Sequence, residues 1–295
     1  MKYAYYPGCS LSSTGIEYDI STKKVAAALG IELWEIPEWN CCGASSAHLT
    51  DHLLALALPA RNLAIAEAKG LDVAIPCAAC YARCKATEVE ASQSMEMRNT
   101  INEVIEREYT GKAKARALLD VFVNDLGLEA VNTLVNNPLK DLKVASYYGC
   151  LLVRPPKLGF DDAEDPQSMD NLVKAMGGTP VDWAFKTECC GAAHATTKSE
   201  VGFSMIEKIL TAAKDAGADC IATACPLCMN NLDMRQTQVE AKFGKDYKLP
   251  VFYFTELMGL ALGMNPGELG LNKHFVDAVS LAKKLVEAEG RRDTA

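Results

Sequence analysis

The sequence lacks the features of a membrane-spanning, secreted or nucleic-acid-binding protein. No run approaches the roughly 18 to 20 uninterrupted apolar residues of a membrane span. The start, MKYAYYPGCS, lacks the basic-then-apolar layout of a secretory signal. We therefore expect no transmembrane segment and a cytoplasmic location. The net charge is −8 and no basic run exceeds a pair such as Lys23-Lys24, so we expect no nucleic-acid partner.

Cysteine is the abundant residue that calls for an explanation. The chain has 295 residues, enough for one large domain or two ordinary ones, and 12 of them are cysteine. Its apolar and charged fractions, 49% and 23%, are those of an average globular protein. Structural disulfides are rare in the reducing cytosol, so metal binding or redox chemistry is the leading explanation for these cysteines.

Ten of the cysteines form two sets with the same layout. An offset of 148 residues separates Cys42 from Cys190 and again Cys77 from Cys225, and the letters CCGA occur in both sets. The first gap is 31 residues in one set and 38 in the other, and we expect the surplus in a polar surface loop at 161–168. The first set is Cys9, Cys41, Cys42, Cys77 and Cys80, and the second is Cys150, Cys189, Cys190, Cys225 and Cys228.

Strands alternate with helices in both halves. We expect strands at 3–7, 31–36 and 73–76, then at 143–148, 180–183, 220–224 and 251–254. We expect helices at 17–29 and 51–69, then at 166–176 and 198–216. This alternation predicts an α/β fold of two similar Rossmann-like halves with parallel sheets. Each cysteine group follows a strand, at the sheet edge where ligands usually bind.

The same pattern suggests a division of the chain into three segments. A first half would occupy 1–81 and a second half 142–295. Between them, 82–141 would be a mainly helical connector without a counterpart elsewhere.

The layout of the thiols limits the chemistry. A lone CxxC is found in redox pairs, zinc sites and iron–sulfur sites alike. Adjacent cysteines are strained as a disulfide, but both thiolates can reach one metal assembly. Five thiolates per half exceed the four that tetrahedral zinc or an ordinary cubane cluster uses. The fifth therefore bridges metals, is spare, or serves a cluster of unusual shape.

The complete pattern, C–x31–CCG–x33–CxxC followed by C–x38–CCG–x33–CxxC, resembles the CCG-domain family, and within it the catalytic subunit of heterodisulfide reductase. The resemblance implies one non-cubane [4Fe–4S] cluster on each set, with all five cysteines of the set as ligands. It also implies a disulfide reductase. In the family the substrate is the mixed disulfide of coenzyme M and coenzyme B, a disulfide of methanogenesis.

The resemblance also implies partners. Reducing a disulfide takes two electrons, whereas a cluster usually passes one, so two facing clusters would each supply one. The chain has no C-x2-C-x2-C-x3-C-P ferredoxin run of its own. The implied electron route is a ferredoxin-like subunit of the same complex, which is fed in turn by a flavin-containing subunit.

Two alternatives stay open. The chain could be a CCG-type electron-transfer subunit of a sulfur-oxidising or organic-acid-oxidising complex. It could also be a zinc-stabilised scaffold without a redox role, or hold zinc at one of its two sites, because thiolates bind zinc readily.

Several other residues are weaker candidates. His48 and His194 follow the two CCG turns and could donate a proton or a hydrogen bond at the clusters, or be ordinary loop residues. Tyr6 and Tyr147 could line cluster pockets, although tyrosine is common in strands.

Three cationic residues and the two remaining cysteines are also weaker candidates. Lys186, Lys198 and Arg154 could hold an anionic substrate tail, but solvated surface charge is the simpler interpretation. Cys84 could be a spare ligand, yet its counterpart at the 148 offset is Leu232, which favours core packing. Cys220 falls in an expected buried strand and is interpreted as an apolar filler.

Overall fold

The computed structural model describes residues 1–44 and 46–290, and its framework is a pair of four-stranded sheets. The sheets have the orders β2-β1-β3-β4 and β6-β5-β7-β8, and every pairing is parallel. The predicted α/β fold with two similar parallel-sheet halves is thereby confirmed. The strands are β1 (Lys2–Tyr5), β2 (Glu32–Glu35), β3 (Val73–Ile75), β4 (Ala115–Ala117), β5 (Lys143–Tyr147), β6 (Thr179–Pro180), β7 (Cys220–Thr223) and β8 (Val251–Tyr253).

The two sheets have the same connectivity. In the first, β1 pairs with β2 on one side and with β3 on the other, and β5 does the same with β6 and β7. The chain therefore reverses its direction of winding at β1 and at β5. This is the topological switch point at which open α/β sheets usually bind ligands.

Strand β4 was not expected from the sequence. It lies inside the segment 82–141 and pairs in parallel with β3, with Val73 opposite Ala115. The expectation that this segment has no counterpart is therefore wrong at β4, because β8 occupies the same place beside β7. The strand has only three residues, with Arg116 at its centre, so it carries no apolar run to reveal it. The three-segment division stays a prediction, with the first sheet extending into the middle segment.

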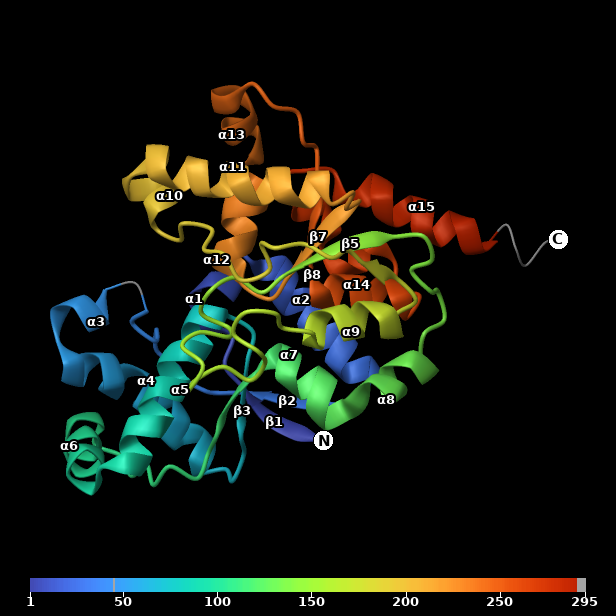
Figure 1. Ribbon diagram of the computed structural model, residues 1–295. Coiled ribbons are helices and arrows are strands. Elements are labelled where there is room, and N and C mark those ends of the chain that lie inside the picture. Colours follow the sequence, from blue (N-terminus) through green and yellow to red (C-terminus); the bar gives the residue numbers. More distant parts are fainter. Residues whose placement is uncertain (45, 291–295) are drawn as a thin grey trace.

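Helices cover both sheets and also lie between them. Helices α2 and α14 pack against each other between the first sheet and the second, which lie one above the other in Figure 1. Four helices match the expected ranges closely: α2 (Ile16–Ala28), α4 (His52–Glu67), α9 (Ser168–Ala175) and α11 (Ser199–Asp215). The other α-helices are α1 (Gly8–Leu11), α3 (Ala47–Thr50), α5 (Ala78–Gln93), α6 (Met95–Ile105), α7 (Leu118–Asp120), α8 (Leu128–Thr133), α10 (His194–Thr197), α12 (Pro226–Met229), α13 (Gln236–Phe243), α14 (Phe254–Ala261) and α15 (Ala278–Gly290).

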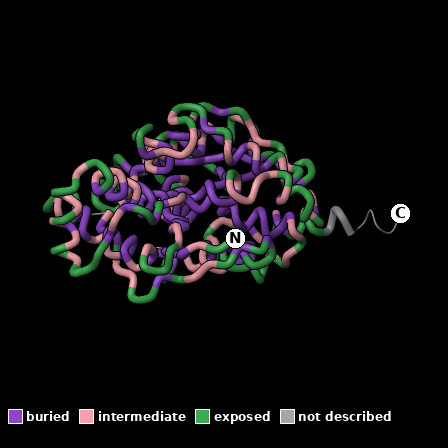
Figure 2. The backbone as a smooth tube through the Cα atoms, turned by 90° about the horizontal axis from the view of Figure 1, so that it is seen from below, coloured by how far each residue is buried: buried purple, intermediate pink, exposed green. Residues whose placement is uncertain are grey.

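One continuous apolar core joins the two halves. Its buried side chains come from both sheets and from the helices between them, and the buried segments run through the middle of the molecule in Figure 2. Buried polar contacts cross the same boundary: the hydroxyls of Ser21 and Thr255 lie 2.7 Å apart, and Tyr81 donates to the carbonyl of Leu158 at 2.6 Å. The relative position of the halves is thus fixed by packing. Within the described residues, no helix combines the length and apolar character needed to cross a bilayer.

Candidate metal centre

The first cysteine set gathers at the carboxyl ends of three strands. Cys9 lies in α1 directly after β1, and Cys41 and Cys42 lie in the loop after β2. Cys77 follows β3 and precedes α5, and Cys80 lies in the first turn of that helix. Parallel strands end at one edge, so the topology alone brings these thiols together.

The second set repeats this arrangement. Cys150 follows β5, and Cys189 and Cys190 follow β6. Cys225 follows β7 and precedes α12, which contains Cys228. All five of these cysteines line one small cavity of about 30 Å³. We call the two gatherings the first-half centre and the second-half centre.

The inner thiols of each centre touch. The Sγ atoms of Cys42 and Cys80 lie 3.3 Å apart, and those of Cys190 and Cys228 lie 3.8 Å apart. These four cysteines are buried, whereas Cys9 is exposed. Each centre therefore extends from the core towards the surface.

The two centres also touch each other. The thiols of Cys77 and Cys225 lie close enough to shift each other's pKa, and each residue directly precedes the helix that carries the second cysteine of its CxxC. Ala78 and Ala79, which follow Cys77, line the cavity of the second-half centre. The cysteine sets that are far apart in sequence thus form one double centre at the interface of the halves.

Hydrogen bonds among the thiols divide them into more and less acidic groups. The Cys80 thiol lowers the pKa of Cys42 to about 7, and the Cys150 thiol lowers the pKa of Cys189 to about 6. The same thiol neighbours, Cys42 and Cys189, raise the pKa of Cys80 and of Cys150. Each centre therefore has a thiol that ionises readily, and the thiolate is the form that binds metal.

The glycine of each CCG turn has a defined task. Gly43 and Gly191 have φ values of +72° and +86°, a conformation that side chains disfavour. This turn aims the Gly43 N–H at the Cys41 Sγ at 3.5 Å, and the Gly191 N–H at the Cys189 Sγ at 3.3 Å. Such donors stabilise a thiolate, whether free or bound to metal.

A second pair of glycines leaves room for sulfur. A Cβ on Gly8 would lie 3.1 Å from the Sγ of Cys80, and a Cβ on Gly149 would lie 3.0 Å from the Sγ of Cys228. Both glycines have positive φ, +69° and +65°. They therefore permit both the turn and the close approach of the thiol.

We expect Gly149→Ala to reduce metal incorporation at the second-half centre, because the added methyl group would displace the Cys228 sulfur. The measurement is metal and sulfide content after anaerobic purification. Gly70→Ala is the matched control, since Gly70 has φ +67° but no atom within 4 Å of the added Cβ. Equal losses of metal in the two variants would show that backbone strain, and not displacement of the Cys228 sulfur, causes the effect.

The two strand tyrosines occupy equivalent places. Tyr6 donates to the carbonyl of Asn40 at 2.8 Å, and Tyr147 donates to the carbonyl of Glu188 at 2.6 Å. Each acceptor is the residue directly before a CCG turn, so each tyrosine anchors that turn. Burial and the neighbouring thiols raise the pKa of both phenols. They therefore remain neutral donors beside the cysteines.

Sequence reasoning missed two residues that act on the inner cysteines. Asn231 donates to the Cys190 Sγ at 3.4 Å, and also to the backbone carbonyls of Cys190 and Ala192 at 3.0 and 3.1 Å. Arg83 holds the equivalent position in the first half, and its charge helps to lower the pKa of Cys42. Both follow the last cysteine of a CxxC by three residues, so the 148-residue offset could have revealed the pair.

The two candidate histidines lie at the outer edge of the centres. His48 is exposed on α3, and His194 is exposed at the start of α10. His194 lies close enough to Cys189 for its charge to help lower the pKa of that thiol. A proton-donating role for either residue stays a prediction.

Two of the candidate cations have other partners. Lys186 is buried and pairs with Asp165 and Asp170, each at 2.7 Å, so the prediction of solvated surface charge is wrong for this residue. Arg154 donates to the Ala163 carbonyl at 3.0 Å and to Glu164 at 2.9 Å. Both side chains hold the loop that contains the longer first gap of the second half. Lys198, directly before α11, is exposed.

The two remaining cysteines are fully buried. Cys220 lies in β7, in the strand where the sequence placed it, and burial raises its pKa. Cys84 lies one turn beyond Cys80 on α5, and burial, together with the negative charge of Cys42 and Glu88, raises its pKa. Both are therefore neutral thiols in the free protein, and Cys84 lies beside the first-half centre.

The arrangement of donors fits an iron–sulfur cluster at each centre. Five thiols per centre converge, glycine leaves space for them, and backbone N–H groups point at the outer sulfurs. Cysteine thiolates with such hydrogen bonds are the usual ligands of these clusters. Across the described chain, no three His, Cys, Asp or Glu side chains are placed to hold a single metal ion.

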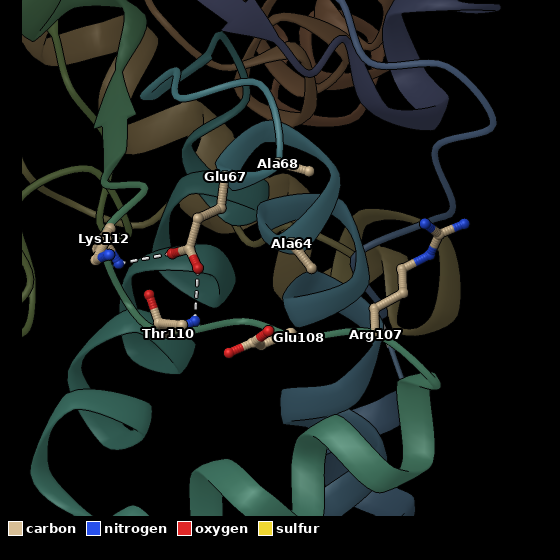
Figure 3. Close-up of a pocket in the computed structure, with 7 residues that line it drawn as sticks. All are labelled: Ala64, Glu67, Ala68, Arg107, Glu108, Thr110 and Lys112. Carbon is tan, nitrogen blue, oxygen red and sulfur yellow. Dashed lines mark hydrogen bonds between the residues drawn. The ribbon is translucent and has the colours of Figure 1, made fainter.

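A larger cavity, of about 480 Å³, has no cysteine in its lining. Its polar centre is Glu67, which accepts from the backbone N–H groups of Thr110 and Lys112, each at 2.6 Å (Figure 3). This carboxylate anchors the segment that leads into β4. The cavity is thus part of the scaffold of the first sheet.

Comparison with known proteins agrees with the doubled centre. The family model for the CCG cysteine-rich domain matches twice, at residues 3–85 and 144–233. The chain is 37% identical, over 95% of its length and 99% of the relative, to the 8-methylmenaquinol:fumarate reductase membrane anchor subunit of Wolinella succinogenes. It is 33% identical, over 97% of both chains, to the B subunit of the ferredoxin/F420H2-dependent CoB-CoM heterodisulfide reductase of Methanosarcina acetivorans.

A solved structure has the same fold. A hypothetical protein from Helicobacter pylori superposes with a TM-score of 0.74 over 94% of this chain, at 15% sequence identity. The chain spans about half the length of that protein, 52%. At this identity the likeness concerns the fold alone.

Proposed function

The chain belongs to the CCG cysteine-rich domain family, and on that premise we propose that it is the disulfide-reducing subunit of an iron–sulfur reductase complex. Its relatives include B subunits of heterodisulfide reductases, which supports the broader statement that this chain is a redox subunit of a reductase complex. The finer proposal is that each centre holds a four-iron cluster of non-cubane type, ligated by its five cysteines. The substrate would be a small disulfide of the CoM-S-S-CoB type.

One observation carries this proposal: across the boundary between the halves, the thiols of Cys77 and Cys225 lie close enough to shift each other's pKa, and Ala78 and Ala79 beside Cys77 line the cavity of the second-half centre. A disulfide takes up two electrons when it is reduced to thiols. Each cluster, when bound, would supply a one-electron couple. Two such couples side by side match the electron count of the substrate.

The chain itself contributes position and access. Exposed Cys9 and Cys41, with half-buried Cys150 and Cys189, place the outer side of each centre near the surface, where a small substrate can approach. The inner cysteines are buried, which excludes water from the side where the centres meet. His48 and His194 are exposed and follow the two CCG turns, and we propose them as proton donors to a departing thiolate.

Partners are part of the proposal. The chain has no ferredoxin cysteine run, so electrons would come from a ferredoxin-like subunit and from a flavin-containing subunit behind it, with the complex in the cytoplasm. Two Methanosarcina relatives, at 33% and 32% identity, are named as the B subunit of heterodisulfide reductases, and a lettered subunit implies further chains in the complex. These names support the proposal that this chain works with partner subunits.

A second candidate has its own support. The Wolinella relative at 37% identity is named for a complex that couples a quinol to fumarate. In that arrangement the two centres would relay electrons between partner subunits and would reduce no disulfide. The same cysteine ligands, and the short separation of the two centres, would serve an electron relay equally well.

Metal analysis followed by turnover separates these functions. We expect a brown anaerobic preparation with about eight irons and eight sulfides per chain, for two four-iron clusters. Reduction of the heterodisulfide by reduced viologen then supports the first proposal. Iron without heterodisulfide turnover, together with quinol-linked electron transfer in the assembled complex, supports the relay. A colourless zinc protein would contradict both and indicate a scaffold.

A further inference from the structure

The two centres are not electrostatically equivalent, although their cysteines are. We propose that Arg83 and Asn231 give the centres unequal reduction potentials, with the first-half centre, beside the Arg83 guanidinium, the easier to reduce. This inference rests on the proposed function, because it requires a cluster at each centre.

Arg83 brings an uncompensated positive charge to the first-half centre. It lies on α5 three residues after Cys80, hence on the same face of the helix as that cysteine. Its Nε is buried without a hydrogen-bond partner, and among the described residues the side chain makes no ion pair. A guanidinium is charged at all relevant pH values. Its field therefore falls on the thiols of the centre, with no carboxylate partner to offset it.

Asn231 brings a neutral amide to the same place in the second half. It lies three residues after Cys228, and its Nδ2 reaches the Cys190 Sγ at 3.4 Å and two backbone carbonyls. The amide stabilises the thiolate by a hydrogen bond but adds no net charge. The two residues share their position after the CxxC, but only Arg83 carries a charge.

The residue before each CCG turn also makes the second-half centre the more negative of the two. The first half has the neutral Asn40, and the second half has Glu188, whose negative charge raises the pKa of Cys189. Glu188 is exposed, so solvent weakens its effect relative to that of Arg83. His194 opposes Glu188 at Cys189, and only when it is protonated.

The sign of the difference follows from elementary electrostatics. Each reduction adds one electron, supplied by an external one-electron donor, and makes a centre more negative. A fixed positive charge nearby favours that change, and a fixed negative charge disfavours it. The first electron taken up by the chain would thus reside at the first-half centre. The second would enter the second-half centre, and only then would the chain hold the pair of electrons that a disulfide needs.

The test is a mediated redox titration of the intact anaerobic protein, followed by paramagnetic resonance, on wild type and three variants. Wild type should give two one-electron midpoints. Arg83→Gln should lower the higher midpoint by about tenfold in the reduction equilibrium constant, about 59 mV for one electron, and leave the lower midpoint in place. Arg83→Lys keeps the charge and should leave both in place. Glu188→Gln should raise the lower midpoint by less.

Each result decides the inference. Equal midpoints in wild type, a shift of the lower midpoint in Arg83→Gln, or the same shift in Arg83→Lys as in Arg83→Gln would overturn it and leave the proposed function intact. The iron content of each sample distinguishes failure of this inference from failure of the proposed function. A wild-type preparation without iron would overturn the proposed function and this inference together.

Discussion

Replacing either Cys42 or Cys190 by serine is expected to abolish turnover of the heterodisulfide and to halve the iron content, from about eight to about four per chain. These are the second cysteines of the two CCG turns, and each touches the inner cysteine of its CxxC, at 3.3 and 3.8 Å. Both are buried, so no solvent ligand can take the place of the thiolate. In the proposed mechanism the disulfide takes one electron from each centre, so the loss of either centre should remove the reaction completely.

The matched control is Cys220→Ala. Cys220 is as buried as Cys42 but lies in β7, without a neighbouring thiol in its hydrogen bonding or its pKa shift. We expect it to keep wild-type iron and turnover with only a modest loss of stability, about 1 kcal/mol for the small cavity. Wild-type activity in both serine variants would sink the disulfide mechanism. Full iron content with lost activity would show that these cysteines act without holding metal.

The spacing of the cysteines predicted that each set gathers at one edge of its sheet. Equal offsets imply equal supersecondary units, and parallel units bring strand ends to one edge, so the two gatherings follow from the sequence. That the halves meet at Cys77 and Cys225 depends on the packing of α2 against α14, which joins residues more than 200 positions apart. No local pattern carries that information.

Local patterns also failed where tertiary contacts override them. Lys186 is preceded and followed by ordinary loop residues, yet it is buried between Asp165 and Asp170, both from an earlier part of the chain. The three-residue strand β4 exists because β3 offers an open edge, and its own composition does not specify it. Arg83 carries no local sequence pattern that marks it, and only its closeness to Cys42, whose pKa its charge helps to lower, gives it a role.

A buried charge network between the halves is expected to control the stability of the fold. His274 and Glu256 pair at 2.8 Å, with side-chain exposures of 1% and 0%. Asp233 accepts from the N–H groups of Phe275 and Val276. Glu17, on α2 of the first half, adds a third carboxylate to the field around His274.

This network is next to the double centre. Tyr18, which follows Glu17, stacks on Tyr253 with ring centroids 4.0 Å apart. The Tyr18 phenol lies close enough to Cys77 and Cys225 for both thiols to raise its pKa further, after burial. The network thus helps to hold α2 and α14 together at the place where the centres meet.

The pH dependence of this contribution has a definite sign. Burial alone would lower the pKa of His274, but Glu256, with Asp233 and Glu17, raises it to about 9. Its charge therefore stabilises the fold fully below about pH 6.5, the unfolded value, and this stabilisation is lost as pH rises towards 9. Burial also raises the pKa of Glu17, Asp233 and Glu256. Those shifts have the same sign, so they also make stability fall as pH rises, and the His274 shift places its own part of the fall between about pH 6.5 and pH 9.

His274→Leu is expected to lower the free energy of unfolding by about 3 to 5 kcal/mol at pH 6, because it leaves buried carboxylates without their counter-charge. It should also flatten the pH dependence between pH 6 and pH 9, as measured by denaturant unfolding at several pH values. His52→Leu is the control: His52 pairs with Glu90 at 3.0 Å, but its side chain is 65% exposed, so its loss should cost less than about 1 kcal/mol. Equal losses in the two variants, or an unchanged pH profile in His274→Leu, would show that the buried pair does not stabilise the fold.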